Sequence, residues 1–377
     1  MNYSRGPITL VRSGAALLAA ALLSACAPAT PGPATVAPTA ATCIFVNPVS
    51  RGADPWVEFR DGYYYMAQSK NPEGQNSTIW VFRSRQLTDP MRDSVLVWSS
   101  PDAGWNQTHV WAPEIRQVDG HWLIYYAAGR PGPSGAPFIF QRSGVLRARG
   151  DDPQGGYEDL GQLDTGGDPA TRADDVWAID LTVYRLNGQL YAVWSGWENN
   201  TPLARTPQHL YIARMSNPWT VSSPRVLLSS PSESWERRVD PVEGLDLMEG
   251  PQFLERNEEV FIIYSTRESW LRWYRLGQLR LRGPDADPMQ PTSWIKSGPV
   301  FAEANGVYGP GHNGFARSPD GTEDWIVYHA KVDTLPNWNR VIRMQPFTWR
   351  PDGSPDFGEP MAAGVPLPVP SGEPCDR

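Results

Sequence analysis

Cysteine is scarce in this chain. Among its 377 residues there are three, Cys26, Cys43 and Cys375. Zinc sites need Cys and His ligands at close, regular spacing, and the sequence contains no such cluster. It also lacks a calcium-binding loop of the EF-hand type. A catalytic metal is therefore not expected, and we expect that no cofactor is required for the chemistry.

Positive charge and long apolar runs are also limited. Lys and Arg number 33 against 41 Asp and Glu, which gives a formal net charge of -8. This balance argues against nucleic acid and polyanionic substrates as partners, but it does not disfavour a neutral sugar. The apolar run at residues 14–23 is too short to span a bilayer as a permanent helix.

That apolar run has the features of a removable export signal. Two arginines precede it, and it leads into Leu23-Ser24-Ala25-Cys26, which resembles the bacterial lipobox. Residues 1–25 are therefore predicted to be a lipoprotein-type signal peptide, with Cys26 lipidated after cleavage. The protein would then be exported and anchored to the outer face of a bacterial membrane. Ordinary signal cleavage, with Cys26 as a bystander, is the alternative.

A sequence motif recurs along the chain. In each copy an Asx-type turn leads into a strand rich in aromatic and β-branched residues, as in Asp119-Gly-His-Trp-Leu-Ile-Tyr-Tyr. This combination predicts a β-hairpin. A second marker, an Asp-Pro or Asn-Pro turn after another strand, follows the first four copies. A long period filled with short strands indicates an all-β, five-bladed β-propeller with one sheet per repeat. The five copies begin at Asp61, Asp119, Asn187, Asn257 and Asp320.

The remaining chain divides into a tether and one domain. Residues 26–42 are rich in Pro, Ala and Thr, which is typical of an extended linker. Residues 43–377 have no composition break, so we expect a single propeller domain, monomeric by default, without a separate carbohydrate-binding module. The ends of a propeller meet, so Cys43 and Cys375 are predicted to form a disulfide worth about 3–5 kcal/mol. Two free thiols are the alternative.

The segments just upstream of the five hairpins are expected to line the central channel. Each contains an acid or a histidine, and unpaired charge is costly in blade-to-blade packing. Carboxylates that converge on one channel suit glycoside hydrolysis, in which one acid protonates the leaving oxygen and one carboxylate activates water. A third can keep the pKa of the acid high. The residues in question are Asp54, Glu114, Asp180, Glu249 and His312.

Together these motifs resemble glycoside hydrolase family 43, whose members are five-bladed propellers that act by inversion on arabinose- and xylose-containing polysaccharides. The resemblance covers essentially the whole of residues 43–377. It implies that Asp54 is the general base, Glu249 the general acid and Asp180 the residue that tunes and orients Glu249. Glu243, which also precedes a glycine, competes for the role of acid, but only Glu249 leads into a hairpin strand. The motifs are Ala53-Asp54-Pro55, Trp111-Ala-Pro-Glu114, Trp177-Ala-Ile-Asp180, Glu249-Gly-Pro251 and Gly309-Pro-Gly-His312-Asn313.

The resemblance also suggests a role for His312. In relatives with this Gly-Pro-Gly-His segment, the histidine lies near a central cation, often calcium reached through waters. A structural Ca²⁺ near His312 is therefore possible, and a satisfied structural histidine is the alternative. His329 is expected to pack inside a hairpin strand, whereas His109 shares the strand of Trp111.

Sugar-binding side chains are harder to assign, because most of the 17 tryptophans must pack between blades. Trp111 and Trp177 share the phase of the catalytic motifs and are candidates for contact with sugar. Arg340 and Arg343 in the closing strand are candidates for holding a carboxylate or a sugar hydroxyl, and Arg343 is our prediction for the substrate. A surface ion pair is the alternative for both.

The second half of the chain is similar to exo-acting α-L-arabinofuranosidases. The expected activity is therefore release of terminal α-L-arabinofuranosyl residues from arabinan or arabinoxylan oligosaccharides. Endo-arabinanase and β-xylosidase remain alternatives within the same mechanism. A surface propeller that binds oligosaccharides without cleaving them is a further alternative, although it would have no use for the three carboxylates at Asp54, Asp180 and Glu249.

Overall fold

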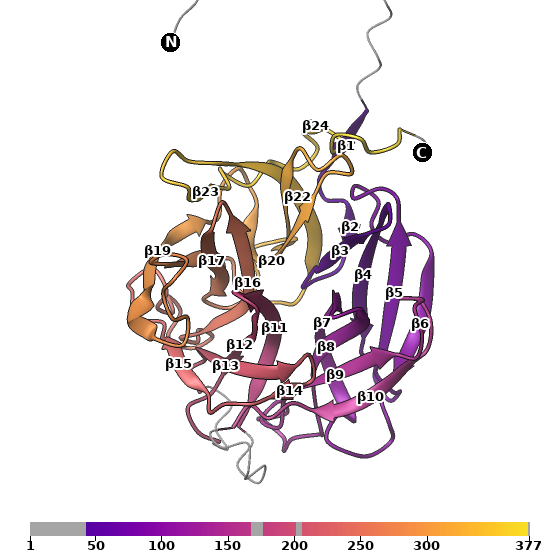
Figure 1. Cartoon of the computed structure of the whole chain (residues 1–377), viewed down its shortest axis with the longest axis vertical. Coiled ribbons are helices and arrows are strands. Elements are labelled where there is room, and N and C mark those ends of the chain that lie inside the picture. Colours follow the sequence, from indigo (N-terminus) through magenta and orange to yellow (C-terminus); the bar gives the residue numbers. More distant parts are fainter. Residues whose placement is uncertain (1–42, 167–175, 201–205, 376–377) are drawn as a thin grey trace, which may run out of the picture. The chain divides into compact units, whose positions relative to one another are not determined.

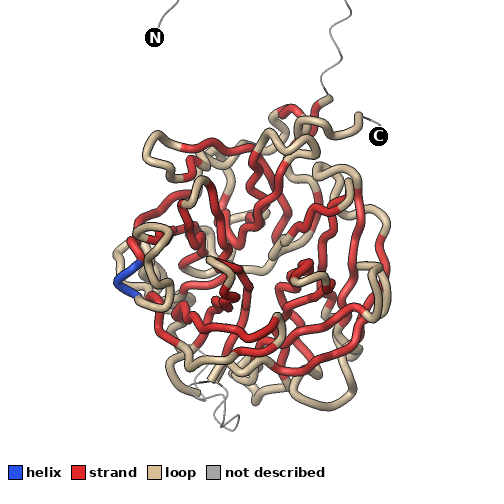
Figure 2. The backbone as a smooth tube through the Cα atoms, in the orientation of Figure 1, coloured by secondary structure: helices blue, strands red, loops and turns tan. Residues whose placement is uncertain are grey.

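The structure is a computed structural model and describes residues 43–166, 176–200 and 206–375. Cys26 and the predicted signal peptide lie outside these residues. Strands dominate the described chain, and its one helical segment is the short 3-10 turn η2 (Pro291–Ser293; Figure 2). No described helix is long and apolar enough to cross a membrane.

The strands form five main sheets in chain order, and Figure 1 shows them arranged around the middle of the domain. This architecture confirms the predicted five-bladed β-propeller. Blade one contains β3 (Val57–Arg60), β4 (Tyr63–Lys70), β5 (Thr78–Ser84) and β6 (Ser94–Ser99). Blade two contains β7 (Thr108–Val118), β8 (His121–Gly129), β9 (Arg142–Ala148) and β10 (Tyr157–Gln162). Blade three contains β11 (Ala178–Leu186), β12 (Gln189–Gly196), β13 (His209–Asn217), β14 (Thr220–Val221) and β15 (Val226–Ser229).

The last two blades complete the ring. Blade four contains β16 (Met248–Arg256), β17 (Glu259–Thr266), β18 (Arg275–Leu281) and β19 (Trp294–Phe301), with η2 (Pro291–Ser293) before its last strand. Blade five contains β20 (Tyr308–Arg317), β21 (Asp324–Lys331), β22 (Arg340–Trp349) and β23 (Pro355–Asp356). The N-terminal β2 (Ser50–Arg51) pairs with β22 and so adds a strand to blade five.

The two ends of the domain are tied together. Strand β1 (Ile44–Val46) pairs antiparallel with β24 (Pro366–Pro368). The Cys43–Cys375 disulfide lies beside this pair, with the two Cα atoms 5.7 Å apart. Sheet pairing through β2 and a covalent bond thus both close the ring between its first and last blades.

The hairpin turns follow the sequence pattern in four blades and depart from it in the fifth. Asn187 and Gly188 both have positive φ, which is the conformation that a two-residue type I′ turn requires. Glu258 takes the second position of the fourth turn at φ 68°, where the other turns have glycine. In blade five β20 ends at Arg317 and β21 begins at Asp324, so this hairpin has a longer loop than predicted.

Neighbouring blades pack through separate apolar clusters. Between blades one and two, for example, the rings of Tyr65 and Trp122 lie 5.1 Å apart in an edge-to-face contact. The hairpin strands supply most of these side chains, because aromatic and β-branched residues fill a sheet-to-sheet interface well. Most tryptophans of the described chain thus belong to packing, as the sequence predicts.

A backbone irregularity at the same point of every blade positions the functional side chains. Near the start of each innermost strand, one residue has a positive φ of 43° to 54°. In blades two to five the ladder to the next strand also shifts register there, as in a β-bulge. Bulges re-aim side chains and interrupt pairing. The five residues are Asp54, Ala112, Asp180, Gly250 and His312.

Candidate active site

A cavity of about 1520 Å³ opens over these bulges. Residues from all five blades line it, and among them are the three predicted carboxylates and the predicted histidine: Asp54, Asp180, Glu249 and His312. Residues from positions 54 to 312 of the sequence therefore meet in one site, as expected for the central channel of a propeller.

Asp54 is surrounded by nitrogen atoms. Its Oδ1 lies 3.2 Å from Nη1 of Arg340, 3.1 Å from Nδ1 of His329 and 3.3 Å from Nδ1 of His312. Burial by itself would raise the pKa of Asp54, but Arg340, His312 and His329 together lower it well below the ordinary range. This carboxylate therefore stays ionised, which is the state that a general base needs.

Glu249 and Asp180 have the opposite electrostatic environment. Both are buried, and burial raises the pKa of each, with a further increase for Asp180 from the neighbouring charge of Glu249. Asp180 accepts a hydrogen bond from the backbone N–H of Gly250 at 3.0 Å, which is the residue after Glu249. The two carboxyl groups thus keep a proton at a pH where Asp54 is ionised.

The lack of a side chain at Gly250 allows a close approach between two blades. A Cβ atom there would lie 3.2 Å from the ring of His312, which is tighter than ordinary van der Waals contact. The close approach brings the backbone of blade four against the histidine of blade five. It also directs the N–H of Gly250 toward Asp180, so the bulge serves both contacts.

Tyr274 and His329 connect the surroundings of the two carboxylates. The Tyr274 hydroxyl donates to Oε1 of Glu249 at 2.8 Å, and its ring stacks on His329 at 5.4 Å with an interplanar angle of 7°. His329 in turn contacts Asp54. From the sequence, His329 is expected only to pack, and no motif points to Tyr274. His329 is buried, but no sequence pattern shows that its ring faces the channel.

Residues 45–355 match the sequence profile of glycosyl hydrolases family 43. The chain belongs to this family. Its family and its five-bladed propeller both agree with the resemblance found from its motifs.

Two relatives with similar sequences are named arabinofuranosidases. An extracellular exo-α-(1→5)-L-arabinofuranosidase of Streptomyces avermitilis is 34% identical over 343 residues, which is 87% of this chain and 66% of that protein. An α-L-arabinofuranosidase of Humicola insolens is 35% identical over 339 residues, which is 86% of this chain and 65% of that protein. This family 43 chain thus spans slightly less than two thirds of the length of both relatives.

A solved structure is similar over nearly its whole length. The crystal structure of an α-L-arabinofuranosidase from Lactobacillus brevis has a TM-score of 0.72 and 31% identity to this chain. The match covers 85% of this chain and 98% of the other. The backbone of a family 43 propeller therefore accounts for the described blades.

Not every acidic residue that the repeat places just upstream of a hairpin lines the cavity. Glu114 lies two residues beyond the bulge of its blade, whereas Asp180 lies at the bulge itself. The carboxylate of Glu114 forms an ion pair with Arg116 at 3.1 Å and accepts a hydrogen bond from the side-chain amide of Gln252 in blade four. Arg116 also contacts the ring of Trp56 at 3.7 Å. Glu114 therefore helps to join blades below the cavity and does not line it.

The structure distinguishes the two candidates for the acid. Glu249 is 6% exposed and its carboxyl group receives the Tyr274 hydroxyl. Glu243 is exposed on the loop before β16, at the edge of the cavity. A group that must keep a proton near neutral pH needs a buried site, so the geometry favours Glu249.

The predicted sugar-binding residues occupy different positions. Trp111 lines the cavity against Phe138, with ring centroids 4.9 Å apart. Trp177 also lines it but is only 3% exposed, because it stacks on Trp197 at 4.7 Å. Arg343 lies away from the cavity lining and donates to the carbonyl of Met361 at 2.6 Å. On this strand it is Arg340 that reaches Asp54.

The residues around His312 do not fit a calcium ion that protein oxygens bind directly. Such an ion takes six to eight oxygen ligands. Within the described residues there is no group of three or more His, Cys, Asp or Glu side chains that could hold a metal. Nδ1 of His312 faces Asp54 instead. An ion held through water molecules stays a prediction.

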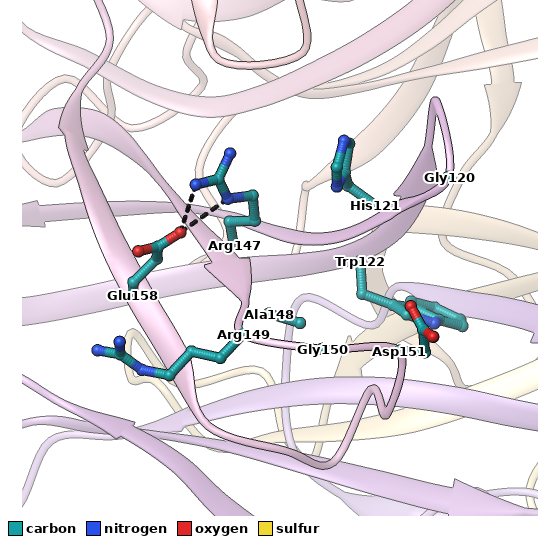
Figure 3. Close-up of a pocket in the computed structure, with 9 residues that line it drawn as sticks. All are labelled: Gly120, His121, Trp122, Arg147, Ala148, Arg149, Gly150, Asp151 and Glu158. Carbon is teal, nitrogen blue, oxygen red and sulfur yellow. Dashed lines mark hydrogen bonds and ion pairs between the residues drawn. The ribbon is translucent and has the colours of Figure 1, made fainter.

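A second, smaller hollow lies on the outer strands of blade two (Figure 3). Its volume is about 390 Å³, and an ion pair between Arg147 and Glu158 at 2.5 Å crosses it. None of the residues predicted for chemistry lines it. It therefore has no part in the catalytic proposal.

Proposed function

We propose that this glycoside hydrolase releases terminal α-L-arabinofuranosyl residues from arabinan or arabinoxylan oligosaccharides with inversion at the anomeric carbon. The observation that carries the proposal is the contrast between two carboxyl groups in one cavity. Asp54 is held ionised by Arg340 and two histidines, whereas buried Glu249 has a raised pKa. Such a pair can divide the roles of base and acid.

In the proposed reaction, Asp54 takes a proton from a water molecule, and that water attacks the anomeric carbon. Glu249 donates its proton to the departing glycosidic oxygen as the bond to the sugar breaks. Asp180 accepts a hydrogen bond from the N–H of Gly250 and so holds the backbone beside Glu249 in place, while burial keeps the pKa of Glu249 raised before the reaction. Each proton transferred is thus accounted for by one carboxyl group.

The preference for arabinose is supported by the names of the two relatives and of the Lactobacillus brevis structure. We also propose that the enzyme is exported, since one of these relatives is described as extracellular. Lipidation at Cys26 would hold it at the outer face of a membrane, where it would process oligosaccharides.

The test compares 4-nitrophenyl α-L-arabinofuranoside, 4-nitrophenyl β-D-xyloside and an arabino-oligosaccharide. Asp54→Asn is expected to abolish turnover of every substrate. Glu249→Gln should lower kcat about 10²–10⁴-fold on the oligosaccharide and less on the nitrophenyl glycoside, because nitrophenolate needs little help from an acid. Glu243→Gln is the matched control and should retain activity. NMR of the first sugar released should show the inverted anomer.

Each outcome has a clear meaning. Turnover of the xyloside alone would refute arabinose specificity and leave the division of roles intact. Full activity of Glu249→Gln on the oligosaccharide would refute the assignment of the acid. A first product with retained configuration would refute the single-displacement mechanism.

A further inference from the structure

Two tryptophans from different blades meet at the rim of the catalytic cavity. Trp270 follows β17 in blade four, and Trp338 precedes β22 in blade five. Their rings lie 5.1 Å apart at an angle of 48°, and both line the cavity. Trp338 is 57% exposed, whereas the other tryptophans of the described chain are buried or partly buried. Blade packing therefore does not explain this pair.

Hydrogen bonds hold the loops of the pair in place. Nε1 of Trp270 donates to the carbonyl of Glu243 at 3.1 Å, and its own carbonyl accepts from the N–H of Asn337 at 3.1 Å. Lys331 donates to the Asn337 carbonyl at 2.6 Å, and Asp333 accepts from the Asn337 amide at 2.9 Å. The surface is therefore preorganised, so a ligand would not have to order it on binding.

An enzyme that removes a terminal sugar holds that sugar at the carboxylates, so the rest of the oligosaccharide extends toward the rim of the cavity, where the pair lies. Trp270 belongs to blade four, which also carries the proposed acid Glu249. Trp338 stands two residues before Arg340, whose guanidinium lies 5.2 Å from its ring and also contacts Asp54. The indole surface is thus continuous with the catalytic residues.

We propose that Trp270 and Trp338 form a platform that binds the sugar on the leaving-group side of the scissile bond. A pentose ring has an apolar C–H face that can lie on the exposed indole, and its hydroxyl groups stay in water at the rim. The proposal rests on the proposed function and adds the part of the enzyme that recognises the oligosaccharide. The platform makes a longer arabino-oligosaccharide a better substrate than a simple glycoside.

The experiment uses two substrates that differ only in the leaving group, methyl α-L-arabinofuranoside and α-1,5-linked arabinotriose. Trp338→Ala should lower kcat/KM about 10-fold more for arabinotriose than for the methyl glycoside, because only the triose reaches the platform. Trp338→Phe should recover part of the loss. Leu335→Ala is the matched control, since Leu335 is 63% exposed on the same loop but has no aromatic face.

A second measurement does not depend on turnover. Calorimetric titration of arabinotriose into Glu249→Gln should give a Kd that rises about 10-fold when Trp338→Ala is added. If Trp338→Ala loses equal activity on both substrates, or none on the triose, the platform is refuted. The proposed function still holds in that case, as long as the wild-type enzyme turns over both substrates. A wild-type enzyme inactive on both substrates would refute the proposed function itself.

Discussion

Removal of the charge beside Asp54 should move the acid limb of the pH profile. Nη1 of Arg340 lies 3.2 Å from Oδ1 of Asp54, and both side chains are largely buried. At an effective dielectric constant of about 20, two unit charges at this separation attract by roughly 5 kcal/mol before desolvation is counted. A single neighbouring cation typically lowers the pKa of an aspartate by about 1–3 units.

The variant Arg340→Met should therefore raise the pKa of Asp54 by about 2 units. The base must be ionised to accept a proton from water, so activity is lost as the pH falls through its pKa. With Arg340 present that pKa lies below the ordinary aspartate range, because this cation and two histidines outweigh burial. Without it, the acid limb of kcat/KM should move to higher pH.

The assay is the pH dependence of kcat/KM on the arabinofuranoside, with circular dichroism at each pH to show that the variant stays folded. Arg340→Lys keeps the charge and is the control, so its acid limb should lie between those of the wild type and Arg340→Met. An unchanged acid limb in folded Arg340→Met would refute the assignment of Asp54 as the base. A uniform loss at every pH would show that Arg340 acts on substrate binding instead.

Three further predictions follow from other contacts. Tyr274→Phe removes a hydrogen bond that lowers the pKa of Glu249. The alkaline limb of the kcat/KM profile should therefore shift to higher pH by about 1 pH unit. Lys296→Met removes the cation that pairs with the fully buried carboxylate of Glu236, and urea unfolding should show a loss of about 3–5 kcal/mol. Cys375→Ser removes the covalent bond between the two ends of the domain, and the same assay should show about 3–5 kcal/mol less stability with activity retained.

The repeat pattern was sufficient to predict the number of blades and most hairpins. Turns such as Asn187-Gly188 are local, because the positive φ of both residues depends on the turn itself. The fifth hairpin shows the limit of that reasoning. Asp320 and Gly321 resemble the other turns, but β20 already ends at Arg317, and the loop folds around Ser318 and the carboxylate of Asp320.

The sequence predicted only in part which carboxylate side chains face the cavity. A repeat places Asp54, Asp180 and Glu114 near the same point of their strands, but a strand reverses the direction of its side chains at every residue. The bulge then decides which of them faces the cavity. Asp180 lies at the bulge, and Glu114 lies two residues beyond it, against Arg116. The position of the bulge depends on pairing between strands.

The sequence by itself determined the propeller and the family and pointed to most of the residues proposed for catalysis, because these follow from local turns, periodicity and short motifs. Only the tertiary structure decided that Arg340 rather than Arg343 reaches Asp54, and that Tyr274 and His329 join the site. It also revealed the indole pair at the rim. The physical reason is that most of these contacts join different blades, and neither their distances nor their burial exists before the ring closes.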